Sequence, residues 1–296
     1  MKTEVSCPQI QLEYPALAKW EQVEVGYWVF LAMAVLAIIL ALWVPRYRLK
    51  KAIAAPFPDE WVDILERNIE VYRNLPTPLR MQLRKLIKQF LHQKTFSGSN
   101  GLVITDEIRL TIAAEACMLL LNRNTNVYPS LRYIIVYPTT FIVDRAQGDW
   151  DGTVNEGSKT LLGESWSNGK VILAWDNVLQ GAKNFEDGHN VVLHEFAHQL
   201  DSETGGTNGA PILTSNSGMR TWAKTLSEEF NELQRDAAKG KRSLIDHYGA
   251  TNPAEFFAVA TETFFEKPGE MNKHHKELFE VLKNYYRIDP REWQVD

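Results

Sequence analysis

The residues best suited to chemistry are His194 and His198, which lie four positions apart in VVLHEFAHQLD with Glu195 between them. Four residues apart on an α-helix, two side chains share one face. Two neutral imidazoles in that arrangement can both bind one Zn²⁺. Glu195 is rotated by roughly 100° from His194, so it can reach a water at the metal without displacing a ligand. The spacing predicts a zinc site with Glu195 as the general base.

The surroundings of this HExxH pattern favour a metal site over a solvated helix face that happens to carry two histidines. With seven histidines in the chain, a chance match arises in about one chain in a hundred. The apolar face at helical spacing predicts that the helix packs against a core. It is formed by Leu193, Phe196, Ala197 and Leu200.

A catalytic zinc site needs a third protein ligand and one open position. Seven downstream side chains could supply that ligand: Asp201, Glu203, His247, Glu255, Glu262, His274 and His275. Asp201 is seven residues past His194, roughly 10 Å along the helix axis, which is too far to share the metal. We expect Asp201 to support a ligand or to be a polar residue at the helix end.

Glu255 stands out among these candidate ligands, because the sequence around it marks the start of a helix. Asn252 is a good N-cap and Pro253 suits the first helical position, which places Glu255 in the first turn. The alternative is that Glu255 only completes a capping box. Glu262, seven residues on, competes for the ligand role or supports a ligand.

HEFAHQLD followed by YGATNPAEFFAV resembles the Mlc titration factor A family of zinc peptidases, and is similar to the catalytic domain of anthrax lethal factor, a gluzincin. The segments LGESWSNGKVILAW, VYPTTF and IAAEAC resemble the same bacterial family, so the resemblance covers roughly residues 59–285. It implies that His194, His198 and Glu255 bind zinc and that Glu195 is the catalytic base.

The resemblance also implies a role for Tyr248, which lies seven residues before Glu255 as in the family pattern. Its phenolic O–H would stabilise the developing oxyanion. From the residues alone, a tyrosine used for packing is the alternative.

The rest of the chain indicates an α+β, zincin-like domain: helices, then a small sheet, then helices. We predict helices over residues 59–74, 77–91 (with Thr77 as N-cap) and 105–119, and strands over residues 133–137, continued by 141–143, and 170–175. The Asn168-Gly169 turn predicts a hairpin from Glu164 into the last strand. That strand is either an edge that binds extended peptides or an ordinary core strand.

Residues 25–44 (VGYWVFLAMAVLAIILALWV) carry no charge and would span roughly 30 Å as a helix, the thickness of a bilayer core. A buried helix is disfavoured because every face is apolar. A cleaved signal peptide is disfavoured because the preceding 24 residues are acidic and lack a basic start. A transmembrane helix is the prediction.

The basic residues after this span predict its orientation. Residues 45–58 form a basic, proline-bounded linker with Arg46, Arg48, Lys50 and Lys51. The positive-inside rule then places residues 1–24 outside and the metallopeptidase domain, 59–296, in the cytoplasm, at a bacterial inner membrane.

Composition agrees with a globular enzyme domain. The 296 residues are 45% hydrophobic and 23% charged, with a net charge of −5, and a mildly acidic balance gives no support to direct nucleic-acid binding. Two distant cysteines, Cys7 and Cys117, exclude a disulfide scaffold, and Cys117 is expected to be buried.

We therefore read the sequence as a membrane-anchored zinc metallopeptidase acting on a peptide or protein substrate. The resemblance leaves a second interpretation open: the protein sequesters a transcriptional repressor and has little peptidase activity. An inert structural zinc domain is less favoured, because three ligands leave an open position. The choice between endopeptidase and aminopeptidase is open.

Overall fold

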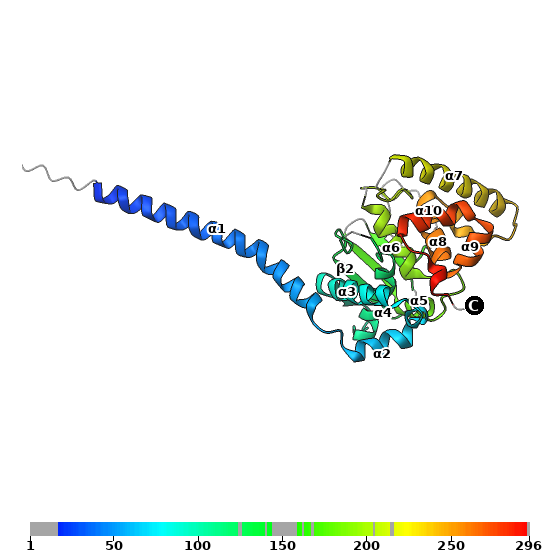
Figure 1. The fold of residues 1–296 in the computed structure, drawn as a ribbon, viewed down its shortest axis with the longest axis horizontal. Coiled ribbons are helices and arrows are strands. Elements are labelled where there is room, and N and C mark those ends of the chain that lie inside the picture. Colours follow the sequence, from blue (N-terminus) through cyan, green and yellow to red (C-terminus); the bar gives the residue numbers. More distant parts are fainter. Residues whose placement is uncertain are drawn as a thin grey trace, which may run out of the picture. The chain divides into compact units, whose positions relative to one another are not determined.

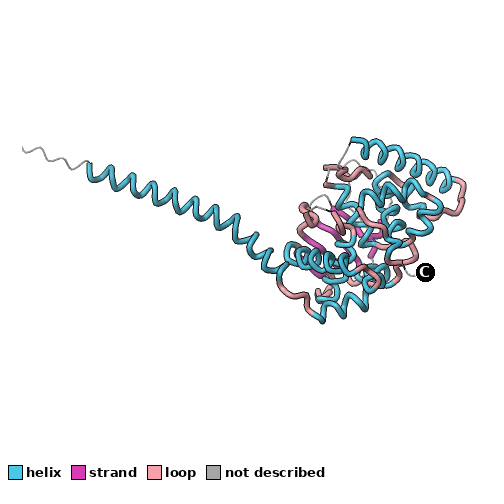
Figure 2. The backbone as a smooth tube through the Cα atoms, viewed as in Figure 1, coloured by secondary structure: helices cyan, strands magenta, loops and turns pink. Residues whose placement is uncertain are grey.

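An N-terminal helix and a larger domain of helices and strands form the two units of the chain, Met1–Ala54 and Ala55–Asp296. The computed structural model describes residues 17–123, 126–139, 141–143, 159–161, 163–166, 169–203, 205–213 and 216–294. The larger unit is mostly helical, with a four-stranded and a two-stranded sheet, consistent with the expected α+β class. Figure 2 shows its strands gathered together with helices around them.

Helix α1 runs from Leu17 to Ala54 (Figure 1), and its part from Tyr27 to Ala54 is long and apolar enough to cross a membrane. The side chains of that part lie exposed, including Trp28, Phe30 and Trp43. Pro45 lies inside the helix, so the first ten residues of the expected linker are helical. Large exposed apolar surfaces of this kind need a non-aqueous partner.

Four strands form the main sheet in the order β1-β2-β6-β5. Strands β1 (Thr95–Gly98), β2 (Tyr133–Tyr137) and β6 (Lys170–Ala174) run parallel, and β5 (Gly163–Trp166) pairs antiparallel with β6. The predicted hairpin is therefore confirmed. Strand β6 has a neighbour on each side, so of its two alternatives the structure shows the inner strand and not the edge. Among the described strands of this sheet, β5 and β1 are the edges.

A second sheet pairs β3 (Phe141–Val143) with β4 (Lys159–Leu161) in antiparallel register. The apolar run suggested that residues 141–143 continue β2. They instead form a separate strand. Their hydrogen-bonding partner lies later in the chain, and a local pattern carries no information about it.

The helices before the sheet are α2 (Asp59–Asn68), the 3₁₀ helix η1 (Glu70–Arg73), α3 (Thr77–Gln93) and α4 (Asp106–Met118). The helix predicted over residues 59–74 is interrupted, because the buried Ile69 has an extended backbone (φ −108°, ψ 102°). Thr77 is the first residue of α3 and Pro76 is its N-cap, a shift of one position from the prediction. Thr105 caps α4 as an acceptor for the Ile108 amide, and Cys117 is buried as expected.

The later elements are α5 (Trp175–Lys183), α6 (Val191–Ser202), α7 (Asn216–Ala238), η2 (His247–Ala250), α8 (Pro253–Glu266), α9 (Pro268–His274), α10 (Lys276–Tyr286) and η3 (Pro290–Glu292). Helix α5 was not predicted; it begins at Trp175, which the sequence suggested as the end of a strand. In Figure 1, α7 to α10 gather on one side of α6, with α3, α4 and β2 on the other. Helix α6 is thus the central element of the domain.

Candidate metal centre

Helix α6 presents its two histidines from a firmly anchored backbone. The side-chain oxygen of Asn190 caps its first turn by accepting the amides of Val192 and Leu193 at 3.1 and 3.0 Å. The apolar face predicted from the sequence is fully buried, and α6 packs against α4, α5, α8 and β5. Burial of four large apolar groups on one helix face fixes the direction in which the opposite face points.

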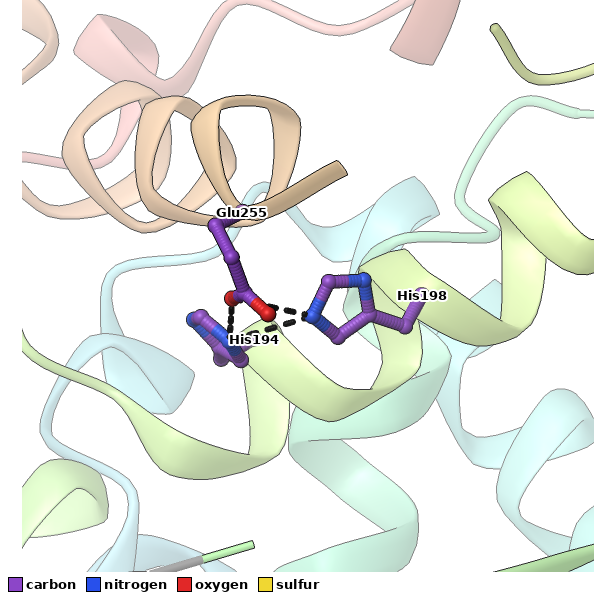
Figure 3. A group of neighbouring side chains, drawn as sticks. All are labelled: His194, His198 and Glu255. Atoms are coloured by element: carbon purple, nitrogen blue, oxygen red, sulfur yellow. Dashed lines mark hydrogen bonds and ion pairs between the residues drawn. The ribbon is translucent and has the colours of Figure 1, made fainter. Parts of the chain in front are cut away.

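Three acceptor atoms from two helices meet at one point above that face (Figure 3). Nε2 of His194 and Nε2 of His198 are 3.2 Å apart, and Oε2 of Glu255 lies 3.0 Å from the first and 3.3 Å from the second. Asn252 caps α8 by accepting the amides of Ala254 and Glu255. The cap places Glu255 in the first helical turn, as predicted, with its side chain aimed at α6.

Glu262 determines which nitrogen of His194 carries the hydrogen. Its Oε1 lies 2.7 Å from Nδ1 of His194, and its Oε2 accepts the backbone amide of Asn190 at 2.6 Å. A carboxylate oxygen is an acceptor, so His194 donates from Nδ1, and its neutral form keeps the lone pair on Nε2. Glu262 therefore supports a histidine, the second of the two roles considered for it.

A metal ion bound by these three atoms would set the distances between them. Four ligands 2.0–2.1 Å from a tetrahedral Zn²⁺ are separated by roughly 3.3–3.4 Å. The observed separations of 3.0, 3.2 and 3.3 Å come within a few tenths of an ångström of that triangle. Two imidazoles and one carboxylate are also a donor set that zinc accepts. The residues present thus fit a zinc ion with one open coordination position.

The same crowding shifts the titration of the groups concerned. Burial raises the pKa of Glu255, but hydrogen bonds with His194 and His198 lower this pKa by more than burial raises it. The pKa of Glu255 therefore lies below its usual range. Burial lowers the pKa of His194, and the carboxylates of Glu255 and Glu262 more than reverse this effect. The first shift favours the ionised carboxylate of Glu255, and the second favours a positive charge beside it.

Glu195 and Tyr248 border the same site. Glu195 is only 3% exposed, on the helix that carries both histidines. Tyr248 lies in η2, 56% exposed, with its ring centroid 6.0 Å from that of His194. Burial of part of the side chain, followed by the charges of Glu255, Glu195 and Glu262, raises the pKa of Tyr248. Its phenol therefore keeps its proton at neutral pH, and its exposure argues against a purely packing role.

The other ligands considered from the sequence lie outside this cluster. Asp201 is fully buried and accepts the amides of Gly209 and Ala210 at 2.6 and 2.9 Å, which fixes the loop after α6. His275 pairs with Glu229 through a 2.7 Å contact. His247 and His274 are exposed and Glu203 is half-buried, and none of the three belongs to the group of converging acceptors.

Sequence reasoning missed the polar residues beneath the histidines. Asn190 donates from its side-chain amide to Oε1 of Glu115 on α4 at 2.6 Å. Glu266 on α8 accepts the amide of Gly188 at 2.8 Å. A single carboxylate inside the apolar stretch IAAEAC, and an Asn directly before the metal helix, were the available signals.

A helix with two histidines one turn apart, faced by a glutamate from a second helix, is the arrangement that defines a class of metallopeptidases. Comparison with known proteins identifies the family. Residues 43–287 match the glucose-regulated metallo-peptidase M90 family, and the chain belongs to it.

Similar proteins cover most of the chain. The uncharacterized protein slr2042 of Synechocystis is 41% identical over 260 residues, which are 86% of this chain and 94% of its own length. Proteins named Mlc titration factor A from Yersinia pestis and Yersinia pseudotuberculosis are 29% identical over 235 residues, 78% of this chain and 85% of their own length. The family resemblance inferred from the motifs is confirmed.

Proposed function

We propose that this protein is a membrane-anchored zinc peptidase that hydrolyses peptide bonds with an activated water. The observation that carries the proposal is the triangle of acceptors formed by His194, His198 and Glu255, with sides close to those of a tetrahedral zinc site. Membership of a metallo-peptidase family supports it. These three side chains would hold the ion.

When bound, zinc would polarise the scissile carbonyl and lower the pKa of the attacking water. The remaining work belongs to the chain's own groups. Glu195 would accept the proton from the water and pass it to the leaving amine. Tyr248 would donate a hydrogen bond to the developing oxyanion, an interaction that strengthens in the transition state. Glu262 would keep His194 in the tautomer that presents Nε2.

The test is digestion of a peptide library by the full-length protein in detergent micelles, with Glu195→Gln as the matched control. Glu195→Gln removes the base and preserves size, so we expect zinc content to survive and cleavage to cease. Identical product patterns from both proteins, or none from the zinc-loaded native chain, would reject the proposal. The position of the cleaved bonds distinguishes an endopeptidase from an aminopeptidase.

A second candidate function follows from the Yersinia relatives, whose name describes titration of Mlc. The chain could likewise bind a transcriptional regulator. Such binding does not require Glu195, because a base for water has no part in holding a partner. Co-purification of a regulator with equal yield from native and Glu195→Gln chains, without cleavage, would favour this function.

We place the anchor, residues 25–44, in the bacterial inner membrane with the peptidase domain in the cytoplasm. Support comes from the length and apolar composition of α1 and from the four basic residues that follow the span. The short basic cluster would lie near the anionic headgroups of that leaflet.

A further inference from the structure

Asn190 makes more hydrogen bonds than an N-cap requires. Its Oδ1 caps α6 through the amides of Val192 and Leu193, its Nδ2 donates to Oε1 of Glu115, and its backbone amide donates to Oε2 of Glu262. The residue is 1% exposed. Each of these polar groups of Asn190 is therefore hydrogen-bonded within the protein.

These bonds lead directly to the metal cluster. One carboxylate oxygen of Glu262 accepts the backbone amide of Asn190, and the other accepts Nδ1–H of His194. The carbonyl of Asn190 accepts the backbone amide of His194 at 2.9 Å. Asn190 thus fixes both the backbone of His194 and the carboxylate that orients its ring. His198 has no comparable support, since no described group hydrogen-bonds its buried Nδ1.

The side chain of Asn190 is held from two directions. Glu115, fully buried on α4, accepts its Nδ2 at 2.6 Å. On the other side, a Cβ at Gly181 of α5 would come within 3.2 Å of Asn190 Cα, Cγ and Nδ2. The amide consequently has little freedom to rotate away from Glu115.

The choice of residue type is informative. Ser, Thr and Asp cap helices about as well as Asn. Only Asn joins the capping acceptor to an NH₂ donor. Asp at this position would direct a second carboxyl group at Glu115, and Ser would not reach it. Capping alone thus does not require Asn at this position, whereas the hydrogen bond to Glu115 requires a donor.

We propose that Asn190, held in place by Glu115, is a positioning residue that orients His194 for metal binding. This inference rests on the proposed function, in which His194 is a zinc ligand. It predicts that the affinity for the metal and the coordination geometry depend on the hydrogen bond between Asn190 and Glu115, although neither residue is a metal ligand.

Removal of the donor tests the proposal. In full-length protein in detergent, Asn190→Ser keeps a cap and removes the NH₂ donor to Glu115. We expect zinc affinity, measured by chelator competition, to fall by about 10–100-fold, as for other outer-shell changes. We also expect the visible spectrum of bound Co²⁺ to change. Asn190→Asp should bind more like the native chain than Asn190→Ser does, because burial raises the pKa of Glu115 to about 8 and its protonated carboxyl group can donate to the new carboxylate.

Asn68→Ser is the matched control. Asn68 is also buried and also donates to a carboxylate on α4, Oε1 of Glu107 at 3.0 Å, and its further bond among the described residues goes to Oγ1 of Thr111 on the same helix. We expect this variant to lose stability and keep its zinc affinity and Co²⁺ spectrum. Glu115→Gln alone retains an acceptor oxygen. Burial raises the pKa of Glu115 to about 8, so Gln also matches its largely protonated form, and this variant should bind like the native chain.

The outcomes separate this inference from the proposed function. A native chain that fails to bind zinc or Co²⁺ rejects the function itself. A native chain that binds, beside an Asn190→Ser variant with unchanged affinity and spectrum, rejects only the inference. So does an Asn190→Asp variant that binds as weakly as Asn190→Ser. If Asn190→Ser does not fold, Asn190→Thr, which also keeps a cap without the donor, must show the same loss of affinity.

Discussion

At the scale of single residues, the site depends on four carboxylates with four different tasks. Glu255 faces both imidazoles, Glu262 holds the ring of His194, and Glu195 lies buried beside them. Glu115 accepts a hydrogen bond from Asn190, whose backbone amide holds Glu262. Identical chemical groups acquire different roles here because each has different neighbours.

The first prediction concerns the ligand set. His194→Ala, His198→Ala and Glu255→Ala should each lose stoichiometric zinc, because two ligands and a water hold the ion far more weakly than three. Glu262→Ala should retain zinc with affinity reduced by about 10–100-fold. Metal analysis after gel filtration measures both effects. Full zinc in Glu255→Ala together with none in Glu262→Ala would exchange the roles of the two residues.

The second prediction concerns Tyr248. Because its phenol would donate only to the transition state, Tyr248→Phe should lower kcat by about 10²–10³ and leave KM nearly unchanged. Steady-state kinetics on a cleaved peptide provide the measurement, with zinc content as the control. An unaltered kcat would return Tyr248 to a structural role.

The histidine spacing and the start of α8 could be predicted from the sequence because both are local patterns. Asn252, Pro253 and Glu255 lie within four positions of each other, and the structure has the predicted cap. The pair of Asn190 and Glu115 could not be predicted. The two residues are 75 positions apart, and their contact exists only after α4 and α6 have packed.

At the scale of elements, the position of β5 has a consequence for substrate binding. Helix α6 packs against β5, which is an edge of the main sheet on the side of β6. An extended peptide can add to such an edge through main-chain hydrogen bonds. Strand β5 therefore replaces β6 as the expected substrate strand.

The third prediction tests β5 with two proline substitutions, Glu164→Pro and Ser165→Pro. Adjacent residues of an antiparallel strand direct their amides to opposite sides, so one substitution removes an outward amide and the other disrupts pairing with β6. The first should raise KM for extended peptides at full zinc content, and the second should lower stability. Unchanged KM in both zinc-loaded variants would remove β5 from the binding site.

Sequence patterns found most strands and helices but not their neighbours. Residues 170–174 read as a strand from their β-branched and apolar content, and they form one. Their position between β2 and β5 depends on pairing with residues 37 positions earlier on one side and on a hairpin on the other. Periodicity describes which faces of a strand are apolar, and says nothing of which strands lie beside it.

At the scale of the whole molecule, buried acids connect stability to pH. Burial raises the pKa of Glu115 to about 8 and that of Glu266 to about 9, from an ordinary value of 4.5. Between about pH 5 and pH 9 the folded chain therefore keeps protons that the unfolded chain releases. Stability contributed by these two groups is complete below their unfolded pKa and declines as pH rises through this range.

The fourth prediction follows from this sign. The melting temperature of chelator-treated protein should fall between pH 5 and pH 9, and the fall should be shallower in the Glu115→Gln/Glu266→Gln variant. Thermal scans in a single buffer series test it. Parallel curves for the two proteins would show that these acids do not hold their protons in the fold.

The fifth prediction concerns membrane topology. If residues 46–51 remain in the cytoplasm, a protease added to intact spheroplasts should leave the domain after Lys51 uncut, and detergent permeabilisation should expose it. Immunoblotting against the C-terminus provides the readout. Digestion without permeabilisation would place the domain on the outer side.

Glu255 on α8 lies 57 residues after His198 on α6, so the residues that would hold the ion enclose a long stretch of chain. An ion held by all three would act as a reversible cross-link that closes a long loop only in the folded state. At a free zinc concentration 100 times the Kd, such binding adds about 2.7 kcal/mol to the free energy of unfolding. The metal-free chain would be the form that opens and is degraded first. Zinc supply would then govern how long each molecule survives in the cell.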